Sequence, residues 1–290
     1  MHLAPETGCH EELIERLQSP LARSTDLTAS LHFLLGMAWM RTKSFKLAAA
    51  EFKRCIEKRG RPALSPVNRN ILKAGPNHCL ALCLAQIQEF AAAESAFLAG
   101  LEEDPHSRPI RFDYAEFLAR RARELEALQI LHPLVSDAKT EPEVWHLGGE
   151  IALSIPDFID FAADWTGEAL KQHPRSSSIR RQRSEALLLS GHITAALPLW
   201  IECAEDKPDA RGLAAVILCQ LAEDLTTTPC QAADEPAVSR EFIKWYRRLI
   251  DVNRHDLLGR LNQRRSHLAQ ALPTAAELLR TALQEAGTVA

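Results

Sequence analysis

Apolar residues recur every three or four positions along most of the 290-residue chain. The two most apolar runs, residues 31–40 and 213–222, are much shorter than the ~20 residues that a membrane-spanning helix needs. No stretch alternates apolar and polar residues with the period of two that indicates a strand. The pattern therefore predicts an all-α chain of short amphipathic helices, with no membrane span.

A second, longer period is carried by small residues within the predicted helices. Ala93, Ala127, Ala162 and Ala196 are separated by 34, 35 and 34 residues. An alanine at the closest approach of two helices lets their backbones pack tightly, and a large residue one turn later fills the space beside it. A proline then ends the second helix of each pair. The large residues are Phe52, Phe97, Leu131 and Trp200, and the closing prolines are Pro105, Pro142, Pro174 and Pro208.

Residues 29–60 combine Leu35-Gly36, Trp39, Ala48 and Phe52 in one helix pair. This spacing resembles the tetratricopeptide repeat, in which these residue types lock two antiparallel helices together. A one-residue irregularity opens the fourth repeat, around Gly148. The resemblance implies an all-α, right-handed superhelical solenoid of antiparallel helix pairs, with one continuous core and one elongated domain.

An insertion interrupts the period early in the chain. Ala48 and Ala93 are 45 residues apart, so about eleven extra residues lie near 58–76. Insertions of this size lie on one rim of a solenoid and often make contacts. The expected organisation is an N-terminal helix or cap (1–28), five to six repeats (29–225), and an irregular loop followed by C-terminal capping helices (226–290).

In tetratricopeptide proteins the first helix of each repeat lines a concave groove, and the resemblance implies the same here. The groove would change from apolar in the first repeats to mixed charge in the later ones. Lysine and asparagine, which clamp the carboxylate tails of chaperones, are absent from these positions, which argues against a co-chaperone role. The predicted groove residues are Phe33, Met37, Met40, His78, Leu82, Phe112, Glu116, Arg120, His146, Glu150, Arg181 and Glu185.

Two of these charged pairs, Glu116 with Arg120 and Arg181 with Glu185, are each four residues apart on a helix. That spacing allows each pair to interact internally, at ~0.2–0.5 kcal/mol. Self-paired charges attract a strongly charged partner only weakly.

The stretch 75–86 places His78, Cys79 and Cys83 close together. A zinc site needs four ligands, and the chain has no second CxxC or HxxxH pattern to supply them. We therefore interpret these residues as packing and predict no metal and no cofactor. The seven cysteines are odd in number and lie mostly in apolar patterns, which is typical of reduced thiols in the cytoplasm. The acidic first residues do not resemble a secretory signal, so we expect a cytoplasmic protein.

The formal net charge of −4 gives no general attraction for nucleic acid. Basic residues cluster at 53–73 and 240–265, and we interpret both clusters as solvated surface, without a nucleic-acid partner. There is no HExxH, GxSxG or glycine-rich phosphate loop, so the sequence predicts no enzyme.

Three segments, 75–105, 111–135 and 145–170, resemble the C-terminal helical-repeat half of bacterial family-2 glycosyltransferases. The catalytic half of those enzymes has no counterpart here. Two hypotheses follow. The first is a non-catalytic interaction scaffold that binds a partner peptide or protein in the groove. The alternative is the repeat half or split companion of such a glycosyltransferase, with that enzyme or its acceptor as partner.

Overall fold

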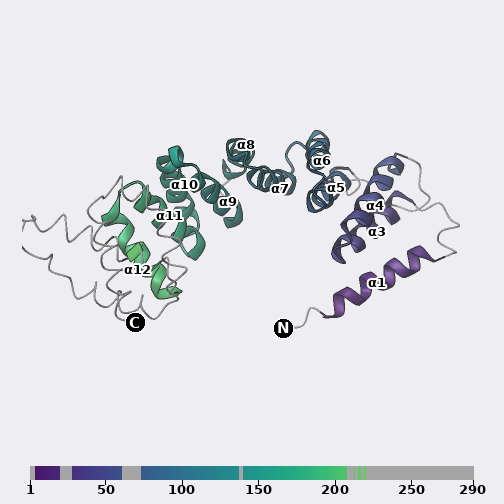
Figure 1. The fold of residues 1–290 in the computed structure, drawn as a ribbon, viewed down its shortest axis with the longest axis horizontal. Coiled ribbons are helices and arrows are strands. Elements are labelled where there is room, and N and C mark those ends of the chain that lie inside the picture. The colour runs from purple at the N-terminus through teal and green to yellow at the C-terminus, as the bar shows by residue number, and fades with distance from the viewer. Residues whose placement is uncertain are drawn as a thin grey trace, which may run out of the picture. The chain divides into compact units, whose positions relative to one another are not determined.

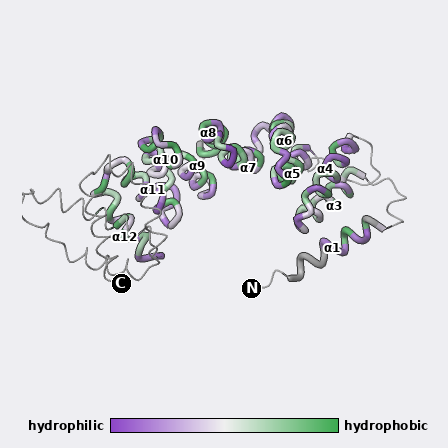
Figure 2. Tube along the Cα trace, in the orientation of Figure 1, coloured by the Kyte–Doolittle hydropathy of each residue, from purple (hydrophilic) through white to green (hydrophobic). Residues whose placement is uncertain are grey.

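The computed structural model describes residues 4–19, 28–60, 73–136 and 140–207, together with Gly212, Ala215, Val216 and Cys219. All regular structure within these ranges is helical, and consecutive helices pack in pairs (Figure 1). The all-α prediction is confirmed. Green and purple alternate along the helices in Figure 2, as expected when one face of each helix is buried.

The chain divides into two compact units, with the boundary between Pro133 and Leu134. The sequence predicted one continuous core instead. In the repeat that precedes this boundary, the second helix of the pair (Glu124–Leu131) has only 8 residues. The second helices of the other described pairs have 14. Pro133 has no N–H to continue that helix, which passes into a 3₁₀ turn.

Among its described residues, unit 1 contains an N-terminal helix and three helix pairs. The N-terminal helix packs on the first repeat, where Ile14 lies against Leu35 and Ala38. The elements are α1 (Ala4–Gln18), α3 (Ala29–Arg41) with α4 (Phe45–Lys58), α5 (Ala74–Gln86) with α6 (Phe90–Glu103), and α7 (Arg108–Ala119) with α8 (Glu124–Leu131), followed by the 3₁₀ turn η1 (His132–Ser136).

The described part of unit 2 contains two further helix pairs. They are α9 (Pro142–Ser154) with α10 (Ile159–Gln172), joined through the 3₁₀ turn η2 (Pro156–Phe158), and α11 (Ser177–Leu189) with α12 (Ile193–Asp206). Of the predicted sixth first-helix, 212–222, only Gly212, Ala215, Val216 and Cys219 are described, and all four are buried and helical. The predicted C-terminal segment 226–290 and residues 61–72 of the predicted insertion lie outside the described residues.

The repeating alanines occupy the positions that the period predicted. The side chains of Ala48, Ala93, Ala127, Ala162 and Ala196 are all 0% exposed. The large residues one turn later are also buried, from 0% for Phe52, Phe97 and Leu131 to 1% for Trp200. The helix pairs are therefore locked as the sequence predicted.

Two glycines let first helices approach an aromatic ring. A Cβ on Gly36 would lie 2.7 Å from the Phe52 ring, and one on Gly148 would lie 2.2 Å from the Trp165 ring. The Trp165 ring is also fixed by its indole N–H, which donates to the carbonyl of Trp145 at 2.9 Å. No residue larger than glycine fits at either position without displacing the ring.

Four of the five turns inside the helix pairs share one backbone design. One residue in each adopts the left-handed conformation: Lys43 (φ 59), Gln88 (φ 65), Ala122 (φ 55) and Gly191 (φ 80). The next N–H then bonds back to the carbonyl five residues earlier, for example Ser44 to Trp39 and His192 to Leu187, both at 2.8 Å. This is the Schellman ending of a helix. The turn of the fourth repeat instead contains Pro156 and the 3₁₀ turn η2.

No helix among the described residues combines the length and the apolar character needed to cross a bilayer.

Candidate partner-binding surface

The first helices of the three repeats in unit 1 touch one another, α3 with α5 and α5 with α7. The predicted site residues of these repeats therefore belong to neighbouring helices of one unit. We call the set Phe33, Met37, His78, Leu82 and Phe112 the first-helix surface. Each of these side chains is partly exposed, and so are Met40 and Glu116.

The contact between α3 and α5 is apolar. The Cys79 thiol lies 3.7 Å from the Met37 sulfur. The Phe33 ring packs 5.7 Å from the Phe52 ring and lies close to Gly75, which has no side chain to cover it. This end of the first-helix surface offers aromatic and thioether groups, which adapt to apolar partners.

The contact between α5 and α7 is a polar pair. His78 Nε2 lies 2.6 Å from Asp113 Oδ2, and the two side chains are 17% and 27% exposed. A carboxylate oxygen accepts, so the histidine ring donates from Nε2–H and leaves Nδ1 as its second polar atom. Sequence reasoning singled out His78 but missed Asp113. The signal was available, since Asp113 follows His78 by 35 residues, one repeat later.

The predicted Glu116–Arg120 pair is present, at 2.6 Å. The side chain of Glu116 is 40% exposed and that of Arg120 is 68% exposed, so the pair is weak and open to solvent. It neutralises the charge beside Phe112 without closing the surface.

The predicted site residues of unit 2 are differently placed. The main-chain carbonyl of His146 accepts a hydrogen bond at 2.9 Å from Nε2 of Gln182, a buried residue outside the predicted set. Glu185 is only 5% exposed, so it lies within the helix packing. The Arg181 guanidinium lies over the Trp200 ring, 5.8 Å from its centroid, and Glu150 is exposed. These residues offer less open apolar surface than their counterparts in unit 1.

The cysteine-rich helix α5 is organised by packing. Leu80, Cys83 and Leu84 are buried, as the repeat period predicted. Burial raises the pKa of the Cys83 thiol to about 12 and that of Cys79 to about 11. Both thiols are therefore protonated at neutral pH and are poor nucleophiles and metal ligands. No group of three metal-ligating side chains that could hold an ion occurs in the part of the chain that the structure describes.

A buried polar network in the first repeat was not anticipated. His32 Nδ1 lies 2.7 Å from Glu51 Oε2, and Lys58 Nζ lies 3.2 Å from His32 Nε2. His32 is 4% exposed and Glu51 is 7% exposed, so no ligand reaches the pair. We interpret it as a link between α3 and α4.

Two arginines of the predicted basic cluster at 53–73 pair with carboxylates. Arg54 pairs with Glu51 at 2.6 Å. Arg59 pairs with Glu103 and also donates to the carbonyl of Lys73 at 2.7 Å. Arg61 and Arg69, and the whole cluster at 240–265, lie outside the described residues. The paired arginines favour a structural role over binding of an anion.

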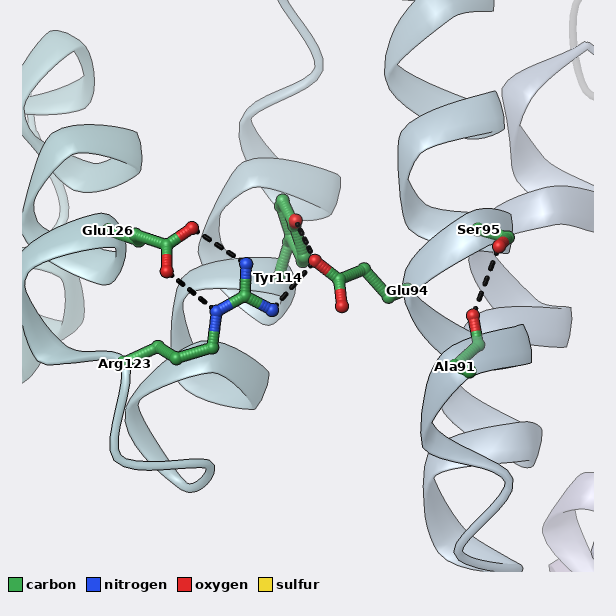
Figure 3. A network of polar contacts seen from close by, with 6 residues as sticks. All are labelled: Ala91, Glu94, Ser95, Tyr114, Arg123 and Glu126. Atoms are coloured by element: carbon green, nitrogen blue, oxygen red, sulfur yellow. Dashed lines mark hydrogen bonds and ion pairs between the residues drawn. The ribbon is translucent and has the colours of Figure 1, made fainter.

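A second network holds the third repeat against the second (Figure 3). Tyr114 donates to Glu94 Oε1 at 3.1 Å, and Arg123 donates to the same oxygen at 2.7 Å. Arg123 also makes two hydrogen bonds to Glu126, each at 2.7 Å. Burial, together with the Glu94 carboxylate, raises the pKa of Tyr114 to about 12. The network ties α6 to α7 and α8, which helps fix the first helices that carry the surface.

Searches for relatives by sequence gave nothing. No family model matches the chain, and no curated protein matches it.

Solved structures resemble it clearly in fold. The C-terminal part of a tetratricopeptide repeat-containing protein from Cytophaga hutchinsonii aligns with a TM-score of 0.64 at 12% identity, covering 86% of this chain and 93% of that one. YrrB, described as a tetratricopeptide protein with an unusual peptide-binding site, aligns with a TM-score of 0.55 at 14% identity, covering 74% and 99%. PilF of Pseudomonas aeruginosa aligns with a TM-score of 0.54 at 13% identity, covering 87% and 96%.

At these identities the likeness concerns the fold alone. Together with the buried alanines and the paired helices, it confirms the predicted fold class: the chain has the fold of a tetratricopeptide-type helical solenoid.

Proposed function

We propose that this protein is a non-catalytic interaction scaffold that binds an extended or helical peptide segment of a partner on the first-helix surface of unit 1. The observation that carries the proposal is the row of partly exposed apolar side chains on α3, α5 and α7, with the His78–Asp113 pair among them. Solvent-exposed apolar groups beside a few polar groups are typical of peptide-binding surfaces.

The chemistry of this surface suggests what the peptide offers. Phe33, Met37, Leu82 and Phe112 suit apolar side chains. His78 Nδ1 suits a polar group of the peptide backbone, because Asp113 holds the other ring nitrogen. The charges nearby are paired within the protein, so the proposed partner segment is mainly apolar and not strongly charged. A YrrB-like peptide-binding role agrees with this proposal.

The test is a selection from a random peptide library on the immobilised protein, followed by fluorescence polarisation with the selected peptides. We expect Leu82→Ala and Phe112→Ala each to weaken binding by about tenfold, because each removes a partly exposed apolar contact. Leu98→Ala, which truncates a leucine that is 46% exposed on α6, is the matched control. Circular dichroism melts check that all three variants fold.

The control should bind within about twofold of wild type, as is usual for a substitution outside an interface. A library that yields no peptide, or peptides that bind Leu82→Ala and Phe112→Ala as tightly as wild type, would contradict the proposal.

The sequence resemblance to the repeat half of family-2 glycosyltransferases supplies the second candidate, a companion that positions such an enzyme or its acceptor. It rests on the three similar segments, and it uses the same surface. A neighbouring reading frame that encodes the α/β transferase domain, and whose product co-purifies with wild type but not with Leu82→Ala, would favour it over the general scaffold.

A further inference from the structure

The first repeat carries an unusual excess of positive charge. Residues 28–60 contain seven lysines and arginines and two glutamates, a net charge of +5 in a chain whose net charge is −4. Three of the seven cations contact other side chains: Arg54 with Glu51, Arg59 with Glu103, and Lys58 with His32. The other four, Arg41, Lys43, Lys46 and Lys53, are exposed and form no ion pair within the described ranges.

These four cations lie around the start and the outer side of α4. Arg41 and Lys43 flank the turn from α3, Lys46 is in the first turn of α4, and Lys53 follows two turns later. The opposite side of the helix, with Ala48, Phe52 and Cys55, is buried. We call Arg41, Lys43, Lys46, Leu47 and Lys53 the basic face.

Helix stability does not explain this arrangement. The N-terminal end of a helix carries partial positive charge, so lysines there are unfavourable and acidic residues are favourable. The first turn of α4 has no acidic residue, and the Ser44 side chain does not cap it. Two other second helices follow the stabilising rule, with Glu124 and Glu126 in α8 and Asp160 in α10, and the first turns of α6 and α12 carry no charged residue. Among the described second helices, α4 alone has a lysine in its first turn.

The basic face also presents an apolar group. Leu47 is 49% exposed and directly follows Lys46. A leucine beside lysines matches a partner surface that combines carboxylates with apolar side chains. A phosphate backbone has no apolar group to meet Leu47, and three of the four cations are lysines, which lack the planar fork with which arginine binds phosphate.

We infer that the basic face of α4 is a second docking surface, and that it takes an acidic segment of a partner protein whose glutamate or aspartate residues are interspersed with leucine-like side chains. Four cations that are unpaired among the described residues surround an exposed leucine, and they complement such a segment in charge. They lie where they do not stabilise the helix itself.

Direct binding of a defined probe tests the inference. The probe is a fluorescein-labelled 14-residue peptide of glutamates with leucines at two positions seven apart. It is compared with the same peptide with serine in place of leucine. We expect Lys43→Glu/Lys46→Glu to weaken binding of the leucine peptide by at least about tenfold, since two attractive charges become repulsive. The matched control is Arg175→Glu/Lys207→Glu, two exposed cations of unit 2, which should change binding by less than about twofold.

Two further readouts separate docking from a structural role. Leu47→Ala should lower affinity for the leucine peptide by about threefold and leave the serine peptide unaffected, because it removes only an apolar contact. The melting temperature of Lys43→Glu/Lys46→Glu should not fall below that of wild type, because the new carboxylates suit the start of α4.

Unchanged peptide binding by Lys43→Glu/Lys46→Glu would overturn the inference. The inference would also be overturned if the protein bound single-stranded DNA or phosphatidylserine vesicles more tightly than the acidic peptide, and if Lys43→Glu/Lys46→Glu abolished that binding. Leu82→Ala in the first-helix surface should leave binding of the acidic probe intact, so this test and that of the proposed function fail independently.

Discussion

The same two repeat positions make different contacts in the two units. In unit 1, His78 of the second repeat pairs side chain to side chain with Asp113 of the third, and both remain partly exposed. In unit 2, the fifth repeat has Gln182 in place of Asp113, 69 residues later in the chain. Gln182 is buried and donates to the main-chain carbonyl of His146 in the fourth repeat.

The comparison shows that one repeat position makes either a partly exposed side-chain pair or a buried contact to the backbone. The Asp113 carboxylate bonds the histidine ring, whereas the longer Gln182 amide bonds the backbone of the preceding helix. Glu116 and Glu185, which also occupy one repeat position, differ in exposure in the same way. Glu116 is partly exposed and Glu185 is buried. The difference favours unit 1 as the location of the proposed peptide site.

The largest effect should come from the glycines at which the two units are alike. Gly148→Ala places a methyl group against the fixed Trp165 ring and should destabilise the protein by about 3 kcal/mol, with a somewhat smaller loss for Gly36→Ala against Phe52. Urea denaturation measures both. Gly60→Ala is the control, since nothing lies within 4 Å of the added atom. Equal stability of Gly60→Ala and Gly148→Ala would refute the packing described for α9 and α10.

A smaller effect should separate the two units. Gln182→Ala removes a buried hydrogen bond and should lower stability by about 1.5 kcal/mol. Asp113→Ala breaks a partly exposed pair and should cost about 0.5 kcal/mol. Asp113→Ala should weaken peptide binding more than Gln182→Ala does, because Asp113 orients the His78 ring on the proposed site. A larger loss of stability for Asp113→Ala than for Gln182→Ala would contradict the comparison.

Substitutions in the turns should also have small effects, and these differ in sign. Ala122 and Gly191 occupy the same turn position in the third and fifth repeats, both with positive φ. Gly191→Ala should cost about 1 kcal/mol, because an alanine side chain disfavours this conformation. Ala122→Gly should stabilise the protein by about 0.5 kcal/mol, because glycine adopts this conformation without strain. The gain is smaller than the loss at Gly191 because glycine also adds entropy to the unfolded chain. Thermal melts of the two variants should therefore shift in opposite directions; shifts of the same sign would be evidence against the shared turn.

Part of the candidate surface could be predicted from sequence. The repeat period placed Phe33, His78, Leu82 and Phe112 on first helices, and the structure finds these side chains partly exposed on neighbouring helices. The period did not identify Asp113, because a carboxylate one repeat away becomes a partner only when two helices meet. It also did not indicate that Glu185 is buried, since burial depends on which neighbouring helices cover that turn. The role of these residues in binding stays a prediction.

The sequence by itself determined the helix pairs and their locking, because an alanine every 34 or 35 residues with a large residue one turn later packs in only a few ways. Tertiary structure alone decided which polar side chains pair across repeats, where the core divides, and which cations on α4 stay unpaired. Those outcomes depend on distances between residues far apart in the chain, which the spacing of any one repeat does not contain.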